Sequence, residues 1–341
     1  NGKRKSKKVG DRRTAEEAAK KINAKLTLGE FGLDDEKKTD TFGDYAKKWI
    51  EITVPATCKE SSRRDYCGIL KNHVLPVFGK TPVNKITRQM VKDFLMSKAN
   101  AGYASSTVTH IKNTISGVLN RAVDDETLVV NPAQRLGKVI RSKSLRIEVD
   151  PLTREELSTL LETFREHFPK HYPMALTLAR TGMRLGEALG LQWGDIDFNG
   201  RFINIQRALS RSEIGTPKSG KARRVDMSLQ LKETLLELRR IRRIETVKKG
   251  WGQVPEWIFI SENGTHLDGS HWRGRVYNKA LEKAGLRKVG VHNLRHAYAS
   301  FLIQAGESLA YVRDQLGHHS IKVTVDIYGH LAPEGNKSAV D

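Results

Sequence analysis

Four short segments in the second half of the chain concentrate side chains that could act on a phosphodiester. Their sequences are Thr181-Gly-Met-Arg-Leu-Gly-Glu187, Thr216-Pro-Lys-Ser219, His292-Asn-Leu-Arg-His296, and Leu316-Gly-His-His-Ser320 followed by Tyr328-Gly-His330. Arg184 and Arg295 each offer a planar guanidinium, which can hold the two non-bridging oxygens of a scissile phosphate and neutralise the charge of a pentacoordinate transition state. A lysine in either place would clamp this group less well. The segments therefore predict chemistry at a phosphate ester.

In order and spacing, these segments resemble the sequence boxes of the tyrosine recombinases and are most similar to those of integrases from phages and conjugative transposons. That family pairs an Arg, a Lys, a His-x-x-Arg, a Gly-His and a nucleophilic Tyr, which fall here on Arg184, Lys218, His292 with Arg295, His318 and Tyr328. One box alone is a weak signal, whereas all of them in order over roughly the last 190 residues leave little room for coincidence. The family usually has Asp after the first His; Asn293 stands there in this chain, outside the catalytic set.

The resemblance implies a catalytic role for each of these side chains. Lys218, at a turn expected between two strands, would protonate the leaving 5′ oxygen as a general acid. His292 and His318 would donate hydrogen bonds to the phosphate, and His292 is the better candidate for exchanging a proton with the tyrosine. Tyr328 would attack phosphorus, giving a 3′-phosphotyrosine and a free 5′ hydroxyl. This ester keeps the bond energy, so rejoining needs no ATP.

Each of these residue types also has an ordinary structural use. Arg184 could pair with Glu187 one turn further on, and Glu187 is expected to orient the arginine in either case. Lys218 could be a surface lysine, and most tyrosines are packing residues with a hydrogen-bonded tip. Capping or packing is expected of three further histidines, two of them at family positions: His296, His330 and His319.

The residues around the boxes predict a mixed domain of helices and strands. Thr153-Arg-Glu-Glu156 is a capping box that begins one helix, and a second helix is expected over Pro173 to Arg180. An Asn-Gly pair at 199–200, between two short apolar runs, predicts a two-residue hairpin, and a third strand is expected to end near Met227. A short helix over Ile321 to Ile327 would carry Tyr328 toward the arginines.

The first half of the chain predicts helices, and the fold class expected is multidomain and mainly α. Residues 39–132 are expected to be an all-helical bundle, similar to the core-binding domain of the family, that ends at an Asn-Pro pair. Residues 133–150 have the composition of a basic linker, and 151–341 are expected to be a mixed α/β catalytic domain with a small antiparallel sheet and a C-terminal tail. Residues 1–38 are a basic arm and helix, similar to the end of an arm-binding domain whose leading strands are missing.

The charge of the chain points to a polyanionic partner. Lys and Arg number 59 against 39 Asp and Glu, a net charge of +20, which favours nucleic acid over an anionic membrane surface. No apolar run approaches the roughly 20 residues that cross a bilayer. The candidate DNA-contacting residues lie in the arm, in the linker and after Lys218: Lys3, Arg4, Lys5, Lys7, Lys8, Arg12, Arg13, Lys138, Arg141, Lys143, Arg146, Lys221, Arg223 and Arg224.

The sequence predicts neither a metal nor a cofactor. Cys58 and Cys67 lack zinc-ligand spacing and are expected to be reduced in a bacterial cytoplasm, where the protein would associate with the nucleoid. There is no Walker-type Gly-Lys-Ser/Thr motif and no cluster of carboxylates for two metal ions.

Taken with the charge, the resemblance implies a site-specific DNA recombinase of a mobile element. Double-stranded DNA would be its substrate, four copies would assemble on DNA and exchange strands through a Holliday junction, and accessory bending or directionality proteins are further possible partners. Two alternatives stay open. A type IB topoisomerase uses the same tyrosine chemistry as a monomer, and a non-catalytic architectural DNA-binding protein could have kept the fold, although the complete catalytic set argues against the latter.

Overall fold

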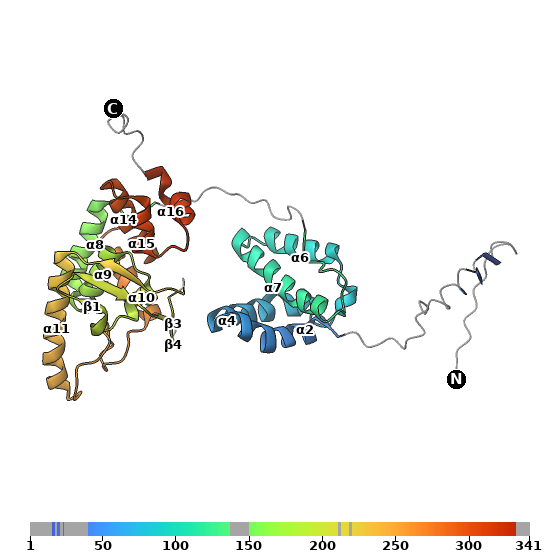
Figure 1. The fold of residues 1–341 in the computed structure, drawn as a ribbon, viewed down its shortest axis with the longest axis horizontal. Coiled ribbons are helices and arrows are strands. Elements are labelled where there is room, and N and C mark those ends of the chain that lie inside the picture. Colours follow the sequence, from blue (N-terminus) through green and yellow to red (C-terminus); the bar gives the residue numbers. More distant parts are fainter. Residues whose placement is uncertain are drawn as a thin grey trace, which may run out of the picture. The chain divides into compact units, whose positions relative to one another are not determined.

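The computed structural model describes residues 40–136, 150–210, 213–217 and 220–331, with scattered positions between 16 and 23 (Figure 1). The chain divides into two compact units, with the division between Ser144 and Leu145. Both units are mainly helical, and the second also contains two small antiparallel sheets. The fold class expected from the sequence is thereby confirmed. No helix in the described ranges is long and apolar enough to span a lipid bilayer.

The first unit is a bundle of helices around one apolar core. Its longest helix, α7 (Ser105–Asp124), buries Val108, Ile111 and Ile115, which recur at the helical spacing seen in the sequence. The elements that precede α7 are α2 (Phe42–Lys48), η1 (Trp49–Thr53), α3 (Val54–Thr57), α4 (Glu60–Ile69), η2 (Leu70–Val74), α5 (Leu75–Phe78), η3 (Val83–Lys85) and α6 (Arg88–Asn100).

The chain leaves this bundle through a buried asparagine. The Asn131 amide donates to the carbonyl oxygen of Ser116 at 2.9 Å and to Oδ1 of Asn120 at 2.6 Å, and its own Oδ1 accepts from the backbone N–H of Ala133 at 2.8 Å. These contacts fix the Asn-Pro segment on α7. Leu136 is also buried in this core, so packing continues past residue 132, where the bundle is expected to end.

The second unit wraps several helices around one central helix, α9 (Tyr172–Thr181). Residues 173 to 179 are all buried, and α8, α11 and α14 pack against α9. The helical elements of the unit are α8 (Arg154–His167), η4 (Pro169–His171), α9, α10 (Leu185–Leu189), η5 (Trp193–Asp195), α11 (Leu229–Lys249), α12 (Gly269–His271), η6 (Trp272–Tyr277), α13 (Asn278–Lys283), α14 (His292–Gln304), α15 (Leu309–Leu316), α16 (Ile321–Tyr328) and η7 (Gly329–Leu331).

The strands of the second unit form one three-stranded and one two-stranded sheet. The larger sheet has the order β1 (Ile196–Asp197), β2 (Phe202–Ile205), β5 (Arg223–Asp226), with every pair antiparallel. Ile203 faces Val225 across β2 and β5, and both are buried. The sequence predicts these three strands but not the hairpin of β3 (Ala208–Ser210) and β4 (Glu213–Gly215), because the residues of β4 are all exposed and show no alternation of apolar and polar residues.

A left-handed glycine ends the central helix. Gly182 follows α9 with φ of 59°, a conformation that costs other residues energy. A Cβ at this position would lie 2.4 Å from Cδ1 of Tyr298 on α14, so the helix end also needs the missing side chain to pack against its neighbour. The turn after α9 is therefore fixed in the interior of the second unit, two residues before Arg184.

We expect Gly182→Ala to destabilise the protein more than Gly250→Ala. Both glycines follow helices in the left-handed region, but a Cβ at Gly250, after α11, would meet no atom within 4 Å. Gly250→Ala should therefore cost only the backbone term of about 1 kcal/mol, while Gly182→Ala adds an overpacking cost of about 1 to 3 kcal/mol. Urea unfolding of the full chain measures both, and equal losses would contradict the packing argument.

Candidate active site

Arg184 and Glu187 meet at the start of α10. The backbone N–H of Arg184 donates to Oε2 of Glu187 at 2.8 Å, and Nη1 of Arg184 donates to Oε1 at 2.9 Å. One carboxylate therefore caps the helix and holds the guanidinium at the same time. The Arg184 side chain keeps 26% of its surface exposed, whereas that of Glu187 keeps 1%. The ion pair expected from the sequence is present, and it orients an arginine that is still accessible.

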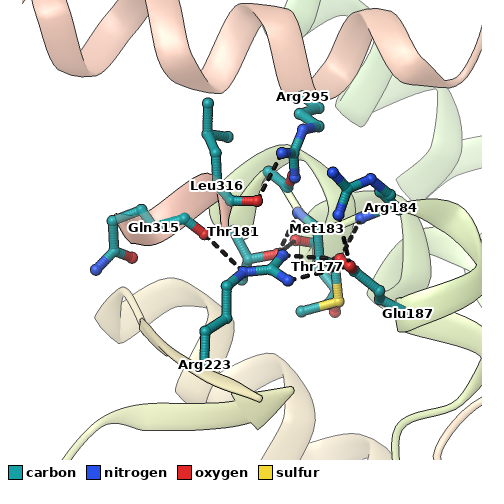
Figure 2. Close-up of polar contacts among 10 residues, drawn as sticks. Thr177, Thr181, Met183, Arg184, Glu187, Arg223, Arg295, Gln315 and Leu316 are labelled. Atoms are coloured by element: carbon teal, nitrogen blue, oxygen red, sulfur yellow. Dashed lines mark hydrogen bonds and ion pairs between the residues drawn. The ribbon is translucent and has the colours of Figure 1, made fainter. Parts of the chain in front are cut away.

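A second arginine, Arg223 at the start of β5, binds the same carboxylate. Its Nη1 and Nη2 donate to the two carboxylate oxygens of Glu187 at 3.0 and 2.7 Å (Figure 2). Burial alone would raise the pKa of Glu187, but the hydrogen bonds and positive charges of Arg223 and Arg184 outweigh it and lower the pKa to about 2. Glu187 is thus a permanent negative charge at neutral pH.

Arg295 lies deeper, on α14, and is held by backbone carbonyl groups. Nη1 donates to the carbonyl oxygen of Gly182 at 2.8 Å, and Nη2 donates to that of Leu316, the last residue of α15, at 2.6 Å. Burial and the charges of Arg184 and Arg223 lower the pKa of Arg295 to about 9, so it still carries its proton at neutral pH. A guanidinium has five N–H donors, so these contacts fix its plane without using all of them.

The cluster carries more positive than negative charge. Arg184, Arg223 and Arg295 stand against the single carboxylate of Glu187 (Figure 2). Buried positive charge in excess is costly unless an anion neutralises it. The arrangement is therefore suited to binding an anion with several oxygen atoms, such as a phosphate diester.

Tyr328 ends α16 and contacts a histidine on α14. Its hydroxyl lies 2.6 Å from Nδ1 of His296, and the residue is only 1% exposed. Burial raises the pKa of Tyr328 to about 12, although the charge of Arg295 acts in the opposite direction. Burial, and to a lesser extent the same arginine, lowers the pKa of His296, which favours its neutral form as a proton acceptor.

His318 and His292 lie beside this cluster. His318 follows Gly317 at the end of α15, and its Nδ1 lies 2.9 Å from Oγ1 of Thr324. Burial lowers the pKa of His318 to about 4, with further contributions from the three arginines and His292, so His318 is neutral at pH 7. His292 begins α14 and is exposed, with its ring centroid 4.8 Å from that of His296.

Two parts of the chain match known protein families. Residues 150–334 match the phage integrase family, and residues 41–99 match the N-terminal SAM-like domain of phage integrases. This chain belongs to the phage integrase family. It is therefore a tyrosine recombinase by descent, as the order and spacing of its sequence boxes predict.

Relatives of this integrase come from bacteria and their mobile elements. A tyrosine recombinase XerC-like protein of Caldanaerobacter subterraneus is 27% identical, with 96% of this chain and 89% of that protein aligned. The ICEBs1 integrase of Bacillus subtilis is 25% identical, over 87% of this chain and 84% of its own length.

Two solved structures share the fold of this integrase. One is the Tn1549 transposon integrase in complex with transposon right end DNA, with a TM-score of 0.72, 18% identity, and coverage of 88% of this chain and 97% of that chain. The other is a lambda integrase tetramer bound to a Holliday junction, with a TM-score of 0.68, 19% identity, and coverage of 96% and 90%.

Most of the predicted catalytic residues come together in the second unit. Arg184, Glu187, Arg295, His318, His292 and Tyr328 are linked by the contacts and charge interactions given above. Of the predicted DNA-contacting residues, Lys221 and Arg224 are exposed. The remaining predicted residues lie outside the part of the chain that the structure describes: Lys218, Lys3, Arg4, Lys5, Lys7, Lys8, Arg12, Arg13, Lys138, Arg141, Lys143 and Arg146. In the described ranges, no group of three or more His, Cys, Asp or Glu side chains could hold a metal ion, and both cysteines are free thiols.

Arg223, which the sequence places among the DNA-contacting residues, has a largely buried side chain in the structure. Its side chain is 8% exposed, and its guanidinium is occupied by Glu187 and by the carbonyl oxygen of Gln315, which accepts from Nε at 3.0 Å. In a strand, alternate residues point to the same face, so Arg223 shares the inward face of β5 with the buried Val225, and Arg224 points outward. This alternation is visible in the sequence and could have separated the two arginines.

His296 is the residue beside the tyrosine that sequence reasoning missed. The sequence predicts a capping or packing role, yet His296 is the histidine hydrogen-bonded to the tyrosine hydroxyl. It lies four residues after His292 on α14, a spacing that places two side chains on one helix face. That spacing is the signal that could have identified it.

Asn293, the departure from the family pattern, anchors the start of the second unit. Its Oδ1 accepts from the backbone N–H of Leu152 at 2.8 Å, and its Nδ2 donates to the carbonyl oxygen of Asp150 at 2.9 Å. An Asp could accept the first bond but not donate the second. Asn293 therefore holds the backbone at the start of the second unit and makes no contact given above with the arginine cluster.

We expect Glu187→Gln to destabilise the protein by about 3 to 5 kcal/mol at pH 7, because the buried arginines lose their counter-charge. The pKa of Glu187 is about 2 in the folded protein against an ordinary 4.5, so its ionised form stabilises the fold above pH 4.5 and progressively less as the pH falls toward 2. The gap between wild type and variant should therefore be about 1 kcal/mol smaller at pH 3.5 than at pH 6.

Urea unfolding at the two pH values measures this gap. Glu237→Gln is the matched control, because Glu237 binds Arg240 through both oxygens on the exposed side of α11, and its loss should change stability little. A gap that is absent, or that does not depend on pH, would contradict the charge argument.

Proposed function

We propose that this integrase is a site-specific DNA recombinase of a mobile element, which cuts and rejoins duplex DNA through a 3′-phosphotyrosine intermediate and a Holliday junction. One observation supports this above all. Arg184, Arg295 and Tyr328, which lie far apart in the sequence, form one cluster with excess positive charge. Family membership and the DNA-bound structures with the same fold agree with this proposal.

The arginine cluster would bind the scissile phosphate. Arg184 is partly exposed and held by Glu187, while Arg295 is fixed by two backbone carbonyl groups. Arg184 is placed to meet a non-bridging oxygen directly, whereas Arg295, which is only 2% exposed, would meet the phosphate once the enclosing structure moves. Guanidinium groups whose planes are already fixed can stabilise a charged transition state. His318, neutral at pH 7, would donate a further hydrogen bond to the same phosphate.

The covalent step would transfer the 3′ phosphate to the tyrosine. A bond forms between the Tyr328 oxygen and phosphorus, and the bond from phosphorus to the 5′ oxygen breaks. His296 lies 2.6 Å from the hydroxyl and would receive the tyrosine proton, a role that the sequence assigns to His292. The leaving 5′ oxygen would take its proton from Lys218. Attack by a 5′ hydroxyl of another strand reverses the step and joins new partners.

The position of Tyr328 implies a movement before cleavage. The residue is 1% exposed, and its hydroxyl is hydrogen-bonded within the protein. A phosphate on duplex DNA cannot reach an atom that is so enclosed. α16 would therefore shift relative to α14 when DNA binds, exposing the hydroxyl next to the arginines.

The rest of the chain would supply DNA affinity and assembly. The net charge of +20 predicts binding that weakens steeply with salt, and the basic residues of the arm and the linker would contact phosphates. Four copies would assemble on two duplexes, a proposal supported by the shared fold with a lambda integrase tetramer on a Holliday junction. Accessory bending or directionality proteins would decide between insertion and excision.

We expect Tyr328→Phe to bind DNA normally and to form no covalent adduct, because only the attacking oxygen is removed. The substrate is a nicked duplex that bears the ends of the element encoding this protein, so that the cleaved fragment diffuses away. A denaturing gel shows the covalent protein–DNA band, and an electrophoretic shift in the same samples confirms binding.

The outcomes of this assay separate the alternatives. Adducts that persist in Tyr328→Phe would remove Tyr328 from the nucleophile's role. Binding without any wild-type adduct would favour the architectural DNA-binding protein. Adduct formation together with relaxation of any supercoiled plasmid, without sequence preference, would favour the type IB topoisomerase.

We expect Arg184→Lys to reduce the cleavage rate by about 100- to 1000-fold at saturating DNA, the value of one transition-state donor. A lysine keeps the charge but not the two-pronged geometry. Single-turnover cleavage measures the loss. Arg180→Lys is the matched control, because Arg180 lies on α9 four residues earlier and is exposed with Gln230 as its partner. Near-normal cleavage by Arg184→Lys would count against the phosphate clamp.

A further inference from the structure

Arg223 joins parts of the site that are distant in the sequence. Its Nη atoms bind both oxygens of Glu187 on α10, and its Nε donates to the carbonyl oxygen of Gln315 on α15 (Figure 2). Gly317 makes room for it, because a Cβ there would lie 2.6 Å from Cδ of Arg223. The guanidinium thus fills the space between the carboxylate that orients Arg184 and the turn that leads to His318.

Arg295 and Arg223 bind neighbouring carbonyl groups. Arg223 takes the carbonyl of Gln315 and Arg295 takes that of Leu316, which are the last two residues of α15. Arg295 also binds the carbonyl of Gly182, two residues before Arg184. The contacts therefore close a ring that runs from the end of α9 through α14, α15 and β5 and back to α10.

We propose that Arg223 is a positioning residue for strand cleavage: it fixes Arg184, through Glu187, relative to Arg295 and His318, and it does not touch DNA. This inference rests on the proposed recombinase function. The side chain of Arg223 is 8% exposed, and its charge is paired with that of Glu187 inside the protein. If Arg223 were removed, Arg184 would keep Glu187 as its partner, but nothing from β5 would hold that carboxylate in place.

The strand that carries Arg223 is tied to the same turn at a second point. The backbone N–H of Asp226, also on β5, donates to Oε1 of Gln315 at 3.0 Å, and the Tyr311 hydroxyl donates to Oδ2 of Asp226 at 2.6 Å. Neither contact involves the Arg223 side chain. A variant at position 223 should therefore keep the packing of β5 on α15 and lose mainly the alignment of Glu187.

The ionisation of Glu187 gives this role a distinctive signature. The charged groups that act on Glu187 are Arg184 at the start of its own helix, Arg223 from β5 and Arg295 from α14. Burial opposes the ionised form, and Arg223 supplies the largest of the interactions that favour it. Without Arg223 the pKa of Glu187 should rise, so protonation at mildly acidic pH would release Arg184. A DNA-contacting or merely structural arginine would not produce this pH dependence.

The experiment compares Arg223→Gln, Arg223→Lys and wild type in single-turnover cleavage of the nicked duplex at saturating protein, from pH 5 to pH 8, with DNA affinity measured at several salt concentrations. We expect Arg223→Gln to cleave up to about 100-fold more slowly at pH 7.5, as misplacement of a catalytic group by a distant change can do. Its rate should fall further at acidic pH than that of wild type. Affinity and its salt dependence should not change. Arg223→Lys keeps the charge but only part of the contacts, so it should cleave at an intermediate rate with a pH profile like that of wild type.

Arg240→Gln is the matched control, because Arg240 also binds a glutamate through two nitrogens, at 2.8 and 2.7 Å, but on the exposed surface of α11. Weaker binding by Arg223→Gln, with a salt slope lower by about one and a normal rate at saturation, would show that Arg223 contacts a phosphate and overturn the inference. Slow cleavage with the wild-type pH profile would also overturn it, because that pattern indicates general destabilisation.

If Arg223→Gln does not fold, Arg223→Lys decides, and wild-type cleavage by that variant would overturn the inference. Absence of cleavage by the wild-type protein would instead contradict the proposed recombinase function, so the two failures are distinguishable.

Discussion

The carboxylate of Glu187 lies among three guanidinium groups in the interior of the second unit, and the geometry of the site depends on it. It accepts two hydrogen bonds from Arg223 and two from Arg184, one of them from the backbone. A buried carboxylate is normally unfavourable, yet here it is the one anion that lets the arginines approach each other at all. Because one negative charge cannot balance three positive ones, the cluster keeps an excess of positive charge that a phosphate can neutralise. The carboxylate that lets the arginines be buried together thus also leaves the net positive charge that suits the cluster to an anion.

Backbone carbonyl groups stabilise the buried positive charge of Arg295. Arg295 is 2% exposed and binds the carbonyl oxygens of Gly182 and Leu316, which lie at the C-terminal ends of α9 and α15. Helix C-termini bear partial negative charge and unsatisfied carbonyl groups, so two helix ends can hold a buried guanidinium without a carboxylate. A carboxylate in their place would neutralise Arg295 and compete with the phosphate. Binding by helix ends instead leaves the positive charge of Arg295 available to an anion.

The sequence predicts the parts of this site that are local and misses those that depend on tertiary contacts. Arg184 and Glu187 are one helical turn apart, so their pairing follows from spacing alone. The Asn-Gly pair at 199–200 correctly places the turn between β1 and β2, but the prediction of a two-residue loop is wrong, because Asp197 pairs with Phe202 and four residues lie between them. Arg223 shows the limit, because a basic run in a DNA-binding chain looks like a phosphate-contacting strand until alternation with Val225 is considered. His296 shows a second limit, because its partner Tyr328 lies on a different helix and the spacing between them in the sequence does not indicate the contact. The β3–β4 hairpin is missed because its exposed residues carry no pattern that burial would impose.

The arginines and the tyrosine are held in place by different elements. The arginines are fixed by the ring of hydrogen bonds that links α10, α14, α15 and β5, whereas Tyr328 ends the last α-helix of the described chain. α16 packs through Thr324 and Tyr328, while Ile321 and Val325 on the same helix are exposed. Moving α16 would break the hydrogen bonds of Tyr328 to His296 and of Thr324 to His318, withdraw Tyr328 from its apolar cluster with residues of α14 and α15, and expose the tyrosine. Under the proposed function, arginines that are fixed before DNA arrives, combined with a nucleophile that stays enclosed until α16 moves, would let phosphate binding precede covalent attack. A covalent bond to DNA is hazardous if formed at the wrong place, and this order of events would make binding of the correct phosphate a condition for it.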